Sequence, residues 1–350
     1  MKILFLDGSA GYYPGRIDKE SCGGIITSLH HIPQYLAASG HDVSLISVHE
    51  KEEEIRGVKH LSKAYDIKPD VVIFNRNLFN NDLVDRYKDA YKIVWLHDIV
   101  EPKYYPDNAY TRMEKFIALS RYCAETYADF YDIPLNKFIV IPNGVDKATF
   151  YPGNYDERDQ KLFIQASAPI KGLYPLHYTF INLKRNVPDV RLVMYGDQSM
   201  HGLPNTKTMQ GQLDELKELG AEIVGPVPQK ELAEQFRKAY ALLMPNSYPE
   251  ICSNILLQAK SCGLPVIASN IGSASEFIHD GIDGLLTHWR PEDMWAWQKD
   301  FAAQAVGLAT SPELHRRISA SAPFGIDSWS DIGAQWHNML NRVVAPVGAI

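Results

Sequence analysis

The chain has 350 residues, of which 45% are apolar and 22% charged, and its formal net charge is −7 at pH 7. This length exceeds the size at which a single hydrophobic core usually stops growing, so two domains are expected. The acidic balance argues against nucleic acid as a partner, because it leaves no excess of cations to neutralise a phosphate backbone. No apolar run reaches the roughly 18 residues of a membrane-spanning helix, whereas a peripheral membrane contact stays open.

Short apolar runs alternate with helical patterns in the first half of the chain, which is typical of a parallel sheet covered by helices. The opening run is too short for a signal peptide and predicts a buried strand. The predicted strands are MKILFLD, DVSLISV, VVIFN, KIVWLHD, FIALS and FIVIP. Helices are predicted at 25–39 and 122–131.

A second series of the same kind follows the loop at 151–158. Its predicted strands are KLFIQAS, VRLVMYG, AEIVG, ALLMPN and PVIAS, and its predicted helices are 174–184, 210–219, 229–239 and 273–279. Two consecutive βα series of similar size predict an α/β chain with two doubly wound domains facing each other across a cleft. The segment 328–343 predicts a further amphipathic helix, with Trp329, Ile332, Trp336 and Leu340 on one face.

The cysteines indicate a reduced protein, because they show no CxxC spacing and no secreted context. They are Cys22, Cys123, Cys252 and Cys262. We therefore expect a cytoplasmic location, with the inner face of a membrane as the alternative. No structural metal is indicated by the sequence.

Polar residues after the strands of the first series are candidates for ligand contacts, because open α/β sheets bind ligands at the carboxyl ends of their strands. Gly23 and Gly24 precede a helix, where glycine amides either approach a phosphate or form a tight turn. His97 and Asp98 follow a strand, where the histidine either contacts a substrate hydroxyl or lies beside a helix-capping Asp. Weaker candidates for an acceptor side are Asn75, Arg76 and Asn77.

The segment MPNSYPEICSNILLQAKSCGLPVIASN in the second series joins a strand end, a carboxylate and a helix start. Glu250 stands where a ligand of such a sheet would lie, and Ser253 and Asn254 are candidate helix caps. The free amides of the helix start suit an anion. In the loop QASAPIKGL, Ser167 and Lys171 suit a phosphate, the alternative being a solvated surface lysine.

Together the Gly-Gly loop, LHD, IPNGVD, ASAPIKGL and PEICSNILLQAKSCGLPVIAS resemble a family-4 retaining glycosyltransferase of the GT-B fold over nearly the whole chain. The resemblance implies a nucleotide-sugar donor held mainly by the C-terminal domain and an acceptor on the N-terminal domain. It also implies that the last helix of the chain crosses back to the N-terminal domain. The domains expected are then 1–150 plus 328–350 on the acceptor side and 151–327 on the donor side.

The resemblance also implies roles for individual residues. Glu250 matches the first carboxylate of the family's E-x7-E motif, which contacts hydroxyls of the donor sugar. Lys171 matches the residue that binds the diphosphate, and His97 matches the histidine near the reacting sugar. The catalytic set is therefore His97, Glu250 and Lys171, and the donor-binding set is Gly23, Gly24, Ser167, Lys171, Glu250, Ile251, Cys252, Ser253, Asn254 and Gln258.

Two positions depart from the family pattern. Gln258 stands in place of the second Glu. The glutamine keeps a carbonyl acceptor for the ribose but lacks the charge, so nucleotide binding is expected to weaken by about 1 kcal/mol. The loop 166–169 lacks the family's usual Arg, which leaves Lys171 as the main cation for the diphosphate.

We therefore expect a metal-independent, retaining transfer of a hexose-type sugar to a glycan, a lipid-linked or another hydroxyl acceptor, without a cofactor. No DxD stands in a suitable loop. A UDP-sugar ranks ahead of a GDP-sugar as donor. The alternatives are another GT-B enzyme, such as an epimerase or a phosphorylase, and a non-catalytic sugar- or nucleotide-binding protein. The sequence does not indicate the acceptor or the oligomeric state.

Overall fold

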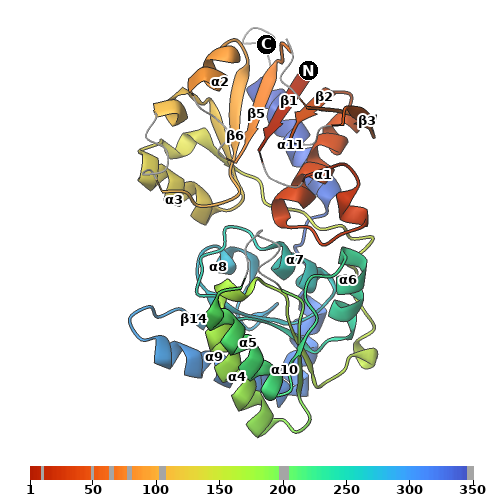
Figure 1. The fold of residues 1–350 in the computed structure, drawn as a ribbon, viewed down its shortest axis with the longest axis vertical. Helices are drawn as coiled ribbons and strands as arrows, with labels where there is room; N and C mark the ends of the chain where they lie inside the picture. Colours follow the sequence, from red (N-terminus) through yellow and green to blue (C-terminus); the bar gives the residue numbers. More distant parts are fainter. Residues whose placement is uncertain are drawn as a thin grey trace. The chain divides into compact units, whose positions relative to one another are not determined.

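The computed structural model describes residues 1–8, 12–48, 51–62, 67–76, 81–101, 108–196 and 205–344. The chain divides into two compact units (Figure 1). The first unit comprises Met1–Ile17, Gly23–Gly144 and Asp327–Ile350, and the second comprises Asp18–Cys22 and Val145–Ile326.

In the described ranges, the sheet of the first unit has eight strands in the order β3-β4-β2-β1-β5-β6-β7-β8. All neighbours run parallel except β3 and β4, which form an antiparallel pair. Central strands such as VVIFN are buried at every position, as expected for a parallel sheet with both faces covered. The strands are β1 (Lys2–Asp7), β2 (Asp42–Ile46), β3 (Glu53–Ile55), β4 (Val58–Leu61), β5 (Val71–Asn75), β6 (Tyr91–Trp95), β7 (Lys115–Ala118) and β8 (Phe138–Val140).

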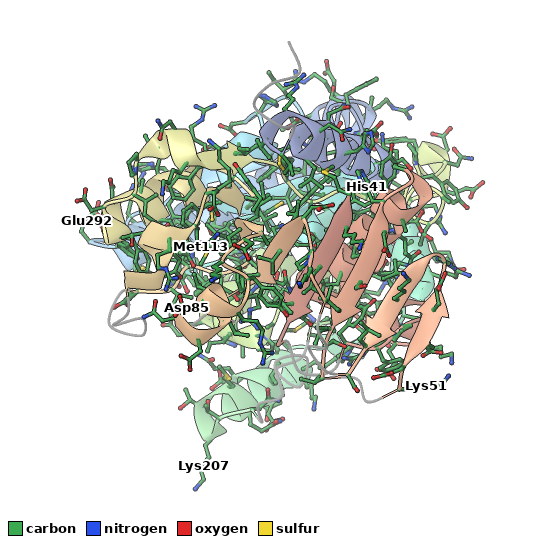
Figure 2. The ribbon with its side chains drawn as sticks, turned by 90° about the horizontal axis from the view of Figure 1, so that it is seen from above. His41, Lys51, Asp85, Met113, Lys207 and Glu292 are labelled. Atoms are coloured by element: carbon green, nitrogen blue, oxygen red, sulfur yellow. The ribbon has the colours of Figure 1, made fainter. Side chains whose placement is uncertain are left out.

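The last helix of the chain, α11 (Trp329–Val343), belongs to the first unit, where it packs on α1 (Gly24–Ala38). A capping box between Ser328 and Asp331 starts α11. Trp336 is fully buried, with its ring 4.8 Å from that of Trp95. Figure 2 shows His41 beside this helix, and its Nε2 lies 3.0 Å from Nδ1 of His337. The predicted return of the final helix to the N-terminal domain is confirmed. Among the described residues, the other α-helices of this unit are α2 (Asn81–Arg86) and α3 (Arg121–Tyr131).

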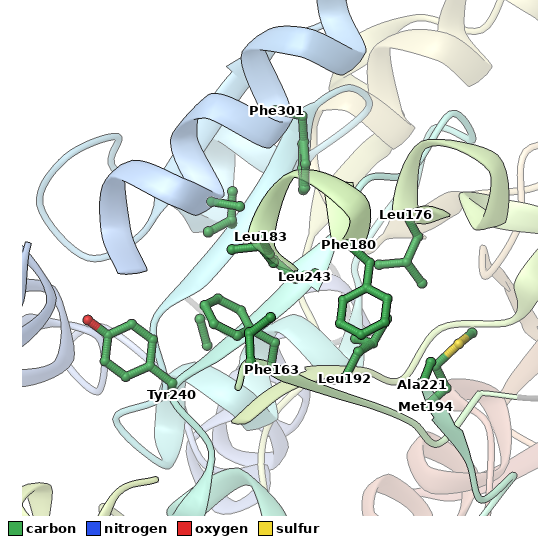
Figure 3. Packing of buried hydrophobic residues seen from close by; sticks show 14 of the residues in the cluster. Phe163, Leu176, Phe180, Leu183, Leu192, Met194, Ala221, Tyr240, Leu243 and Phe301 are labelled. Atoms are coloured by element: carbon green, nitrogen blue, oxygen red, sulfur yellow. The ribbon is translucent and has the colours of Figure 1, made fainter. Parts of the chain in front are cut away.

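The described part of the second unit contains a sheet of six parallel strands in the order β11-β10-β9-β12-β13-β14. Its core includes Phe163 from the sheet and Phe180 and Phe301 from helices (Figure 3). The strands are β9 (Leu162–Gln165), β10 (Arg191–Met194), β11 (Glu222–Ile223), β12 (Ala241–Met244), β13 (Val266–Asn270) and β14 (Leu285–His288). The helices are α4 (Leu173–Asn186), α5 (Lys207–Glu218), α6 (Gln229–Lys238), α7 (Asn254–Ser261), α8 (Ala274–Phe277), α9 (Met294–Ala309) and α10 (Pro312–Ser321).

The parallel part of each sheet reverses its strand order once within the described residues. In the first unit β1 lies between β2 and β5, and in the second unit β9 lies between β10 and β12. Open parallel sheets bind ligands at the carboxyl ends of the strands where this reversal occurs. In the second unit the reversal therefore marks the loops after β9 and β12.

The structure contains elements that the sequence patterns did not predict. The hairpin of β3 and β4 was missed because its first strand is only three residues long and highly charged. The patterns also missed α2, which is short, and α9 and α10. Small alanines spread around α9 blur its apolar stripe, although Trp297, Phe301 and Ala305 are buried on one face. Across the described ranges, no helix combines the length and the apolar character that crossing a membrane requires.

Candidate functional site

Lys171 and Glu250 meet at the strand-order reversal of the second sheet. Lys171 ends a short 3-10 helix (Pro169–Lys171) in the connection after β9, and Glu250 lies in the loop after β12. The Lys171 Nζ donates to Glu250 Oε1 at 2.7 Å. The side chains remain 21% and 20% exposed, so both charges stay accessible to a ligand. A cation and a carboxylate are thus placed together at the edge where such a sheet binds its ligand.

Two serines form hydrogen bonds with the backbone of Lys171 and Glu250. Ser247 donates its backbone N–H to the carbonyl oxygen of Lys171 at 2.7 Å and its hydroxyl to the same oxygen at 3.3 Å. Ser273 donates its backbone N–H and its hydroxyl to the carbonyl oxygen of Glu250, both at 2.9 Å. The backbone of each partner is therefore fixed by a loop from another strand.

Two glycines allow these loops to approach closely. A Cβ at Gly172 would overlap the carbonyl oxygen of Pro245, so the loops after β9 and β12 touch only because this side chain is absent. Gly272 has φ +63°, and a Cβ there would overlap the Glu250 backbone. Since L-residues rarely adopt this φ, glycine is required at this turn on two grounds.

The start of α7 completes the site on the β12 side. Ser253 occupies the N-cap position, but its side chain makes no capping hydrogen bond, which differs from the expected cap. Ile251 and Cys252 are buried. A hollow of about 310 Å³, which includes space open to solvent, lies beside Glu250 and is lined in part by Asn246, Tyr248, Ser253 and Ser269.

Gln258 and Ser167 lie close to this region in the chain and are both buried. Within the described part of the chain, the Gln258 amide makes no side-chain hydrogen bond. The carbonyl oxygen of Ser167 accepts a hydrogen bond from the Gln165 amide at 2.7 Å. The donor contacts that the resemblance implied for these two residues stay predictions.

Beneath the site, α7 is anchored by a buried ion pair. Lys260 Nζ lies 2.9 Å from Asp283 Oδ2, and these side chains are only 2% and 8% exposed. The same ammonium donates to the carbonyl oxygen of Phe277. Burial lowers the pKa of Lys260, and the hydrogen bond and charge of Asp283 oppose that shift.

His97 in the first unit lies two residues after β6 and is 8% exposed. Burial lowers its pKa to about 3, and the Arg76 cation contributes in the same direction. Its Nε2 is buried and has no hydrogen-bond partner within the described ranges. The imidazole is therefore neutral at physiological pH and offers a hydrogen bond without a positive charge.

The weaker candidates of the first unit have different environments. Asn75 is fully buried and donates to Asp7 Oδ1 at 2.8 Å, so the prediction that it lines an acceptor side is wrong. Arg76 forms an ion pair with Asp98 at 2.5 Å. Asp98 therefore serves as an ion-pair partner, and its backbone carbonyl accepts a hydrogen bond from the Tyr127 hydroxyl at 2.8 Å. Asn77 lies outside the described residues.

Gly23 is the N-cap of α1, and a Cβ there would meet no atom within 4 Å. Local packing therefore does not demand glycine at this position. The Gly24 carbonyl accepts a hydrogen bond from the Ser28 hydroxyl at 2.8 Å. The predicted phosphate contact of this pair stays a prediction.

The structure thus brings Lys171, Glu250 and the start of α7 together within the second unit, whereas His97, Gly23 and Gly24 belong to the first unit. Ser247, Ser273 and Gly272 were missed by the sequence analysis. Serine and glycine are common in any loop, so their identities gave no signal; their importance depends on which loops are neighbours.

The whole chain is similar in fold to solved structures. A sucrose-phosphate synthase from Thermosynechococcus elongatus superposes with a TM-score of 0.75 at 16% identity, covering 99% of this chain and 100% of that one. The Anabaena protein HepE, solved in complex with UDP and glucose, superposes with a TM-score of 0.71 at 17% identity over 98% and 100% of the two chains. The predicted GT-B fold, with two Rossmann-like α/β domains, is confirmed.

Residues 149–305 match the family described as Glycosyl transferases group 1, and this segment contains Lys171, Glu250 and α7. A D-inositol 3-phosphate glycosyltransferase of Frankia alni is 30% identical over 214 residues, which is 52% of this chain and 51% of that protein. The chain spans about half the length of the curated relatives it matches.

Proposed function

We propose that this protein is a glycosyltransferase that moves a sugar from a nucleotide-sugar donor to a hydroxyl acceptor. One observation carries the proposal: the Lys171–Glu250 pair lies at the strand-order reversal of the second sheet, inside the segment that matches the glycosyltransferase family. An ammonium suits a diphosphate, and a carboxylate accepts hydrogen bonds from sugar hydroxyls.

For the donor we propose a UDP-sugar first and a GDP-sugar next. The UDP and glucose held by the Anabaena protein of the same fold support this order. Lys171 binds the diphosphate and Glu250 orients the sugar. Amides at the start of α7 add partial positive charge, because the first N–H groups of a helix lack partners inside it. Gln258 accepts a hydrogen bond from the ribose, with less strength than a carboxylate would give.

For the reaction we propose transfer with retained anomeric configuration and without a metal. The bond between the anomeric carbon and the diphosphate breaks, and the acceptor oxygen forms the new bond on the same face. The acceptor proton passes to the departing phosphate oxygen, whose developing charge Lys171 stabilises. The neutral His97 contributes a hydrogen bond near the reacting sugar without opposing the cationic character of the anomeric carbon.

For the acceptor we propose a hydroxyl of a glycan or of a lipid-linked sugar, used in the cytoplasm or at the inner face of a membrane. The family-like segments of the sequence support this class. The acidic net charge of −7 argues against a nucleic-acid acceptor.

Thermal unfolding tests the donor site directly. The protein is heated alone and with saturating UDP, GDP, ADP, dTDP or CMP, each with and without EDTA. A ligand at about 100 times its dissociation constant stabilises the native state by about 2.7 kcal/mol, so one diphosphate should raise Tm by several degrees in wild type. We expect EDTA to leave that shift unchanged and Lys171→Met to remove most of it. No shift with any diphosphate would overturn the proposal.

A further inference from the structure

The Lys171–Glu250 ion pair joins the two charges that the proposed function assigns to different parts of the donor. We propose that this pair makes the site discriminate the intact sugar nucleotide from the nucleoside diphosphate that remains after transfer. The inference rests on the proposed function and goes beyond it, because it concerns product release and not the donor alone.

Each charge of the pair is the principal partner of the other. The Nζ and Oε1 atoms are 2.7 Å apart, which is the length of a charge-assisted hydrogen bond. Among the residues that the structure describes, the next donor to the Glu250 carboxylate is the Asn246 amide, at 3.5 Å from Oε1. Within the described residues, Lys171 forms no second ion pair, and its Nζ lies 5.9 Å from the centre of the Tyr248 ring. Taking either partner away therefore leaves a charge that is about four-fifths buried with too few hydrogen bonds.

The backbone gives the pair little room to separate by moving a loop. The carbonyl oxygens of Lys171 and Glu250 each accept two hydrogen bonds from one serine, Ser247 and Ser273 respectively. Gly172 packs against Pro245 with no space for a Cβ. A ligand must therefore separate the charges by rotating side chains, while both main chains stay in place.

The sugar nucleotide and the bare nucleoside diphosphate differ in whether they offer a hydrogen-bond donor to Glu250. A diphosphate attracts the Lys171 ammonium away from the carboxylate whether or not a sugar is attached. The sugar of an intact donor offers hydroxyl donors to the Glu250 carboxylate, so its lost hydrogen bond is replaced. A bare diphosphate offers none, and its binding leaves the carboxylate short of a partner. The Lys171–Glu250 ion pair therefore favours the donor and helps to expel the product.

The substitution Glu250→Gln distinguishes discrimination by the ion pair from the simple loss of a contact between Glu250 and the ligand. The amide is isosteric and ends the ion pair, so Lys171 is already available to a phosphate. We expect UDP to bind this variant about fivefold more tightly than wild type, while UDP-glucose binds no more tightly. The fivefold change corresponds to about 1 kcal/mol, the upper value typical of a solvent-accessible ion pair.

Isothermal titration calorimetry with UDP and with UDP-glucose, in the absence of acceptor, measures the ratio of the two dissociation constants. GDP and GDP-mannose are used instead if the thermal screen selects GDP. Glu313→Gln on α10 carries the same charge change at an exposed position and should leave both constants unaltered. A cooperative thermal transition and a far-UV circular dichroism spectrum like that of wild type confirm that the Glu250→Gln variant is folded.

The same substitution made in the Lys171→Met variant tests the alternative explanation, which is direct repulsion between the Glu250 charge and the phosphates. In Lys171→Met there is no pair to break, so adding Glu250→Gln should change the UDP dissociation constant by less than about twofold. If the substitution tightens UDP binding as much without Lys171 as with it, the ion pair is not the cause and the inference is overturned. An unchanged or weaker UDP affinity in the single variant also overturns it. Wild type that binds neither the diphosphate nor its sugar nucleotide would overturn the proposed function itself.

Discussion

Ser273 donates both its backbone N–H and its hydroxyl to the carbonyl oxygen of Glu250, each at 2.9 Å. The serine lies in the loop after β13, whereas Glu250 lies in the loop after β12, so a neighbouring strand positions the carboxylate. Ser273 is 1% exposed and is a positioning residue in this arrangement.

Ser273→Ala should lower kcat for sugar transfer by about fivefold while the dissociation constant for UDP stays within about twofold. Loss of one hydrogen bond costs about 1 kcal/mol, and a small displacement of Glu250 acts on the sugar and not on the diphosphate. Steady-state kinetics and UDP titration together measure this split. Ser319→Ala is the matched control, because the buried Ser319 hydroxyl donates to the Gly263 carbonyl at 2.6 Å away from Glu250. Equal losses of kcat in the two variants would contradict a positioning role.

Lys260→Met should reduce the free energy of unfolding by about 3–5 kcal/mol, since it leaves the Asp283 carboxylate buried without its cation. Urea denaturation followed by circular dichroism measures this change. The double variant Lys260→Met with Asp283→Leu should recover part of the loss, because no unpaired charge then remains. A double variant that is less stable than the single one would show that the ion pair itself is not the source of the effect.

Acid should destabilise the second unit through His315. Its Nε2 lies 2.7 Å from the Tyr240 carbonyl oxygen and its Nδ1 lies 2.9 Å from the Tyr155 hydroxyl, which is the pattern of a neutral ring that donates from Nε2 and accepts at Nδ1. Burial lowers its pKa to about 4, although the hydrogen bond to Tyr240 opposes the shift.

As the pH falls, the His315 imidazole is therefore protonated in the unfolded chain before it is protonated in the folded protein. The stabilising contribution of neutral His315 is complete above about pH 6.5, and it declines as pH falls toward the folded pKa of about 4. Between these values His315→Gln should reduce the pH dependence of unfolding by up to about 1.4 kcal/mol per pH unit. Urea titrations at several pH values from 4.5 to about 7 test this. The same slope in the variant and in wild type would contradict it.

Gly333→Ala in α11 should destabilise the first unit by about 1–3 kcal/mol, because the added methyl group would overlap the Tyr35 ring of α1. Gly307→Ala in α9 is the matched control, since a Cβ there meets no atom within 4 Å. That control should be neutral or stabilising by up to about 1 kcal/mol, the usual gain from alanine over glycine in a helix. Thermal unfolding of both variants compares them. A tolerated Gly333→Ala would mean that α11 does not pack this closely.

Hydrophobic patterns predicted the parallel strands well because strands such as VVIFN are buried on both faces and carry continuous apolar runs. The positions of Lys171 and Glu250 after strands were also evident from the chain order. Their direct contact was not, because it depends on β9 and β12 being neighbours in the sheet. Asn75 shows the opposite error: a polar residue at a strand end suggested a ligand contact, yet its partner is Asp7 on the adjacent strand.

The route of the chain through its two units has a consequence for biosynthesis. The pocket for Trp336 is built from residues such as Phe5 and Trp95, which leave the ribosome long before α11 does. The second unit lies between them in the sequence and has all its strands available before that last helix is made. The nascent first unit must therefore keep an apolar surface uncovered while its neighbour is synthesised. If translation stalls before residue 329, the unfinished chain exposes this surface to chaperones and proteases.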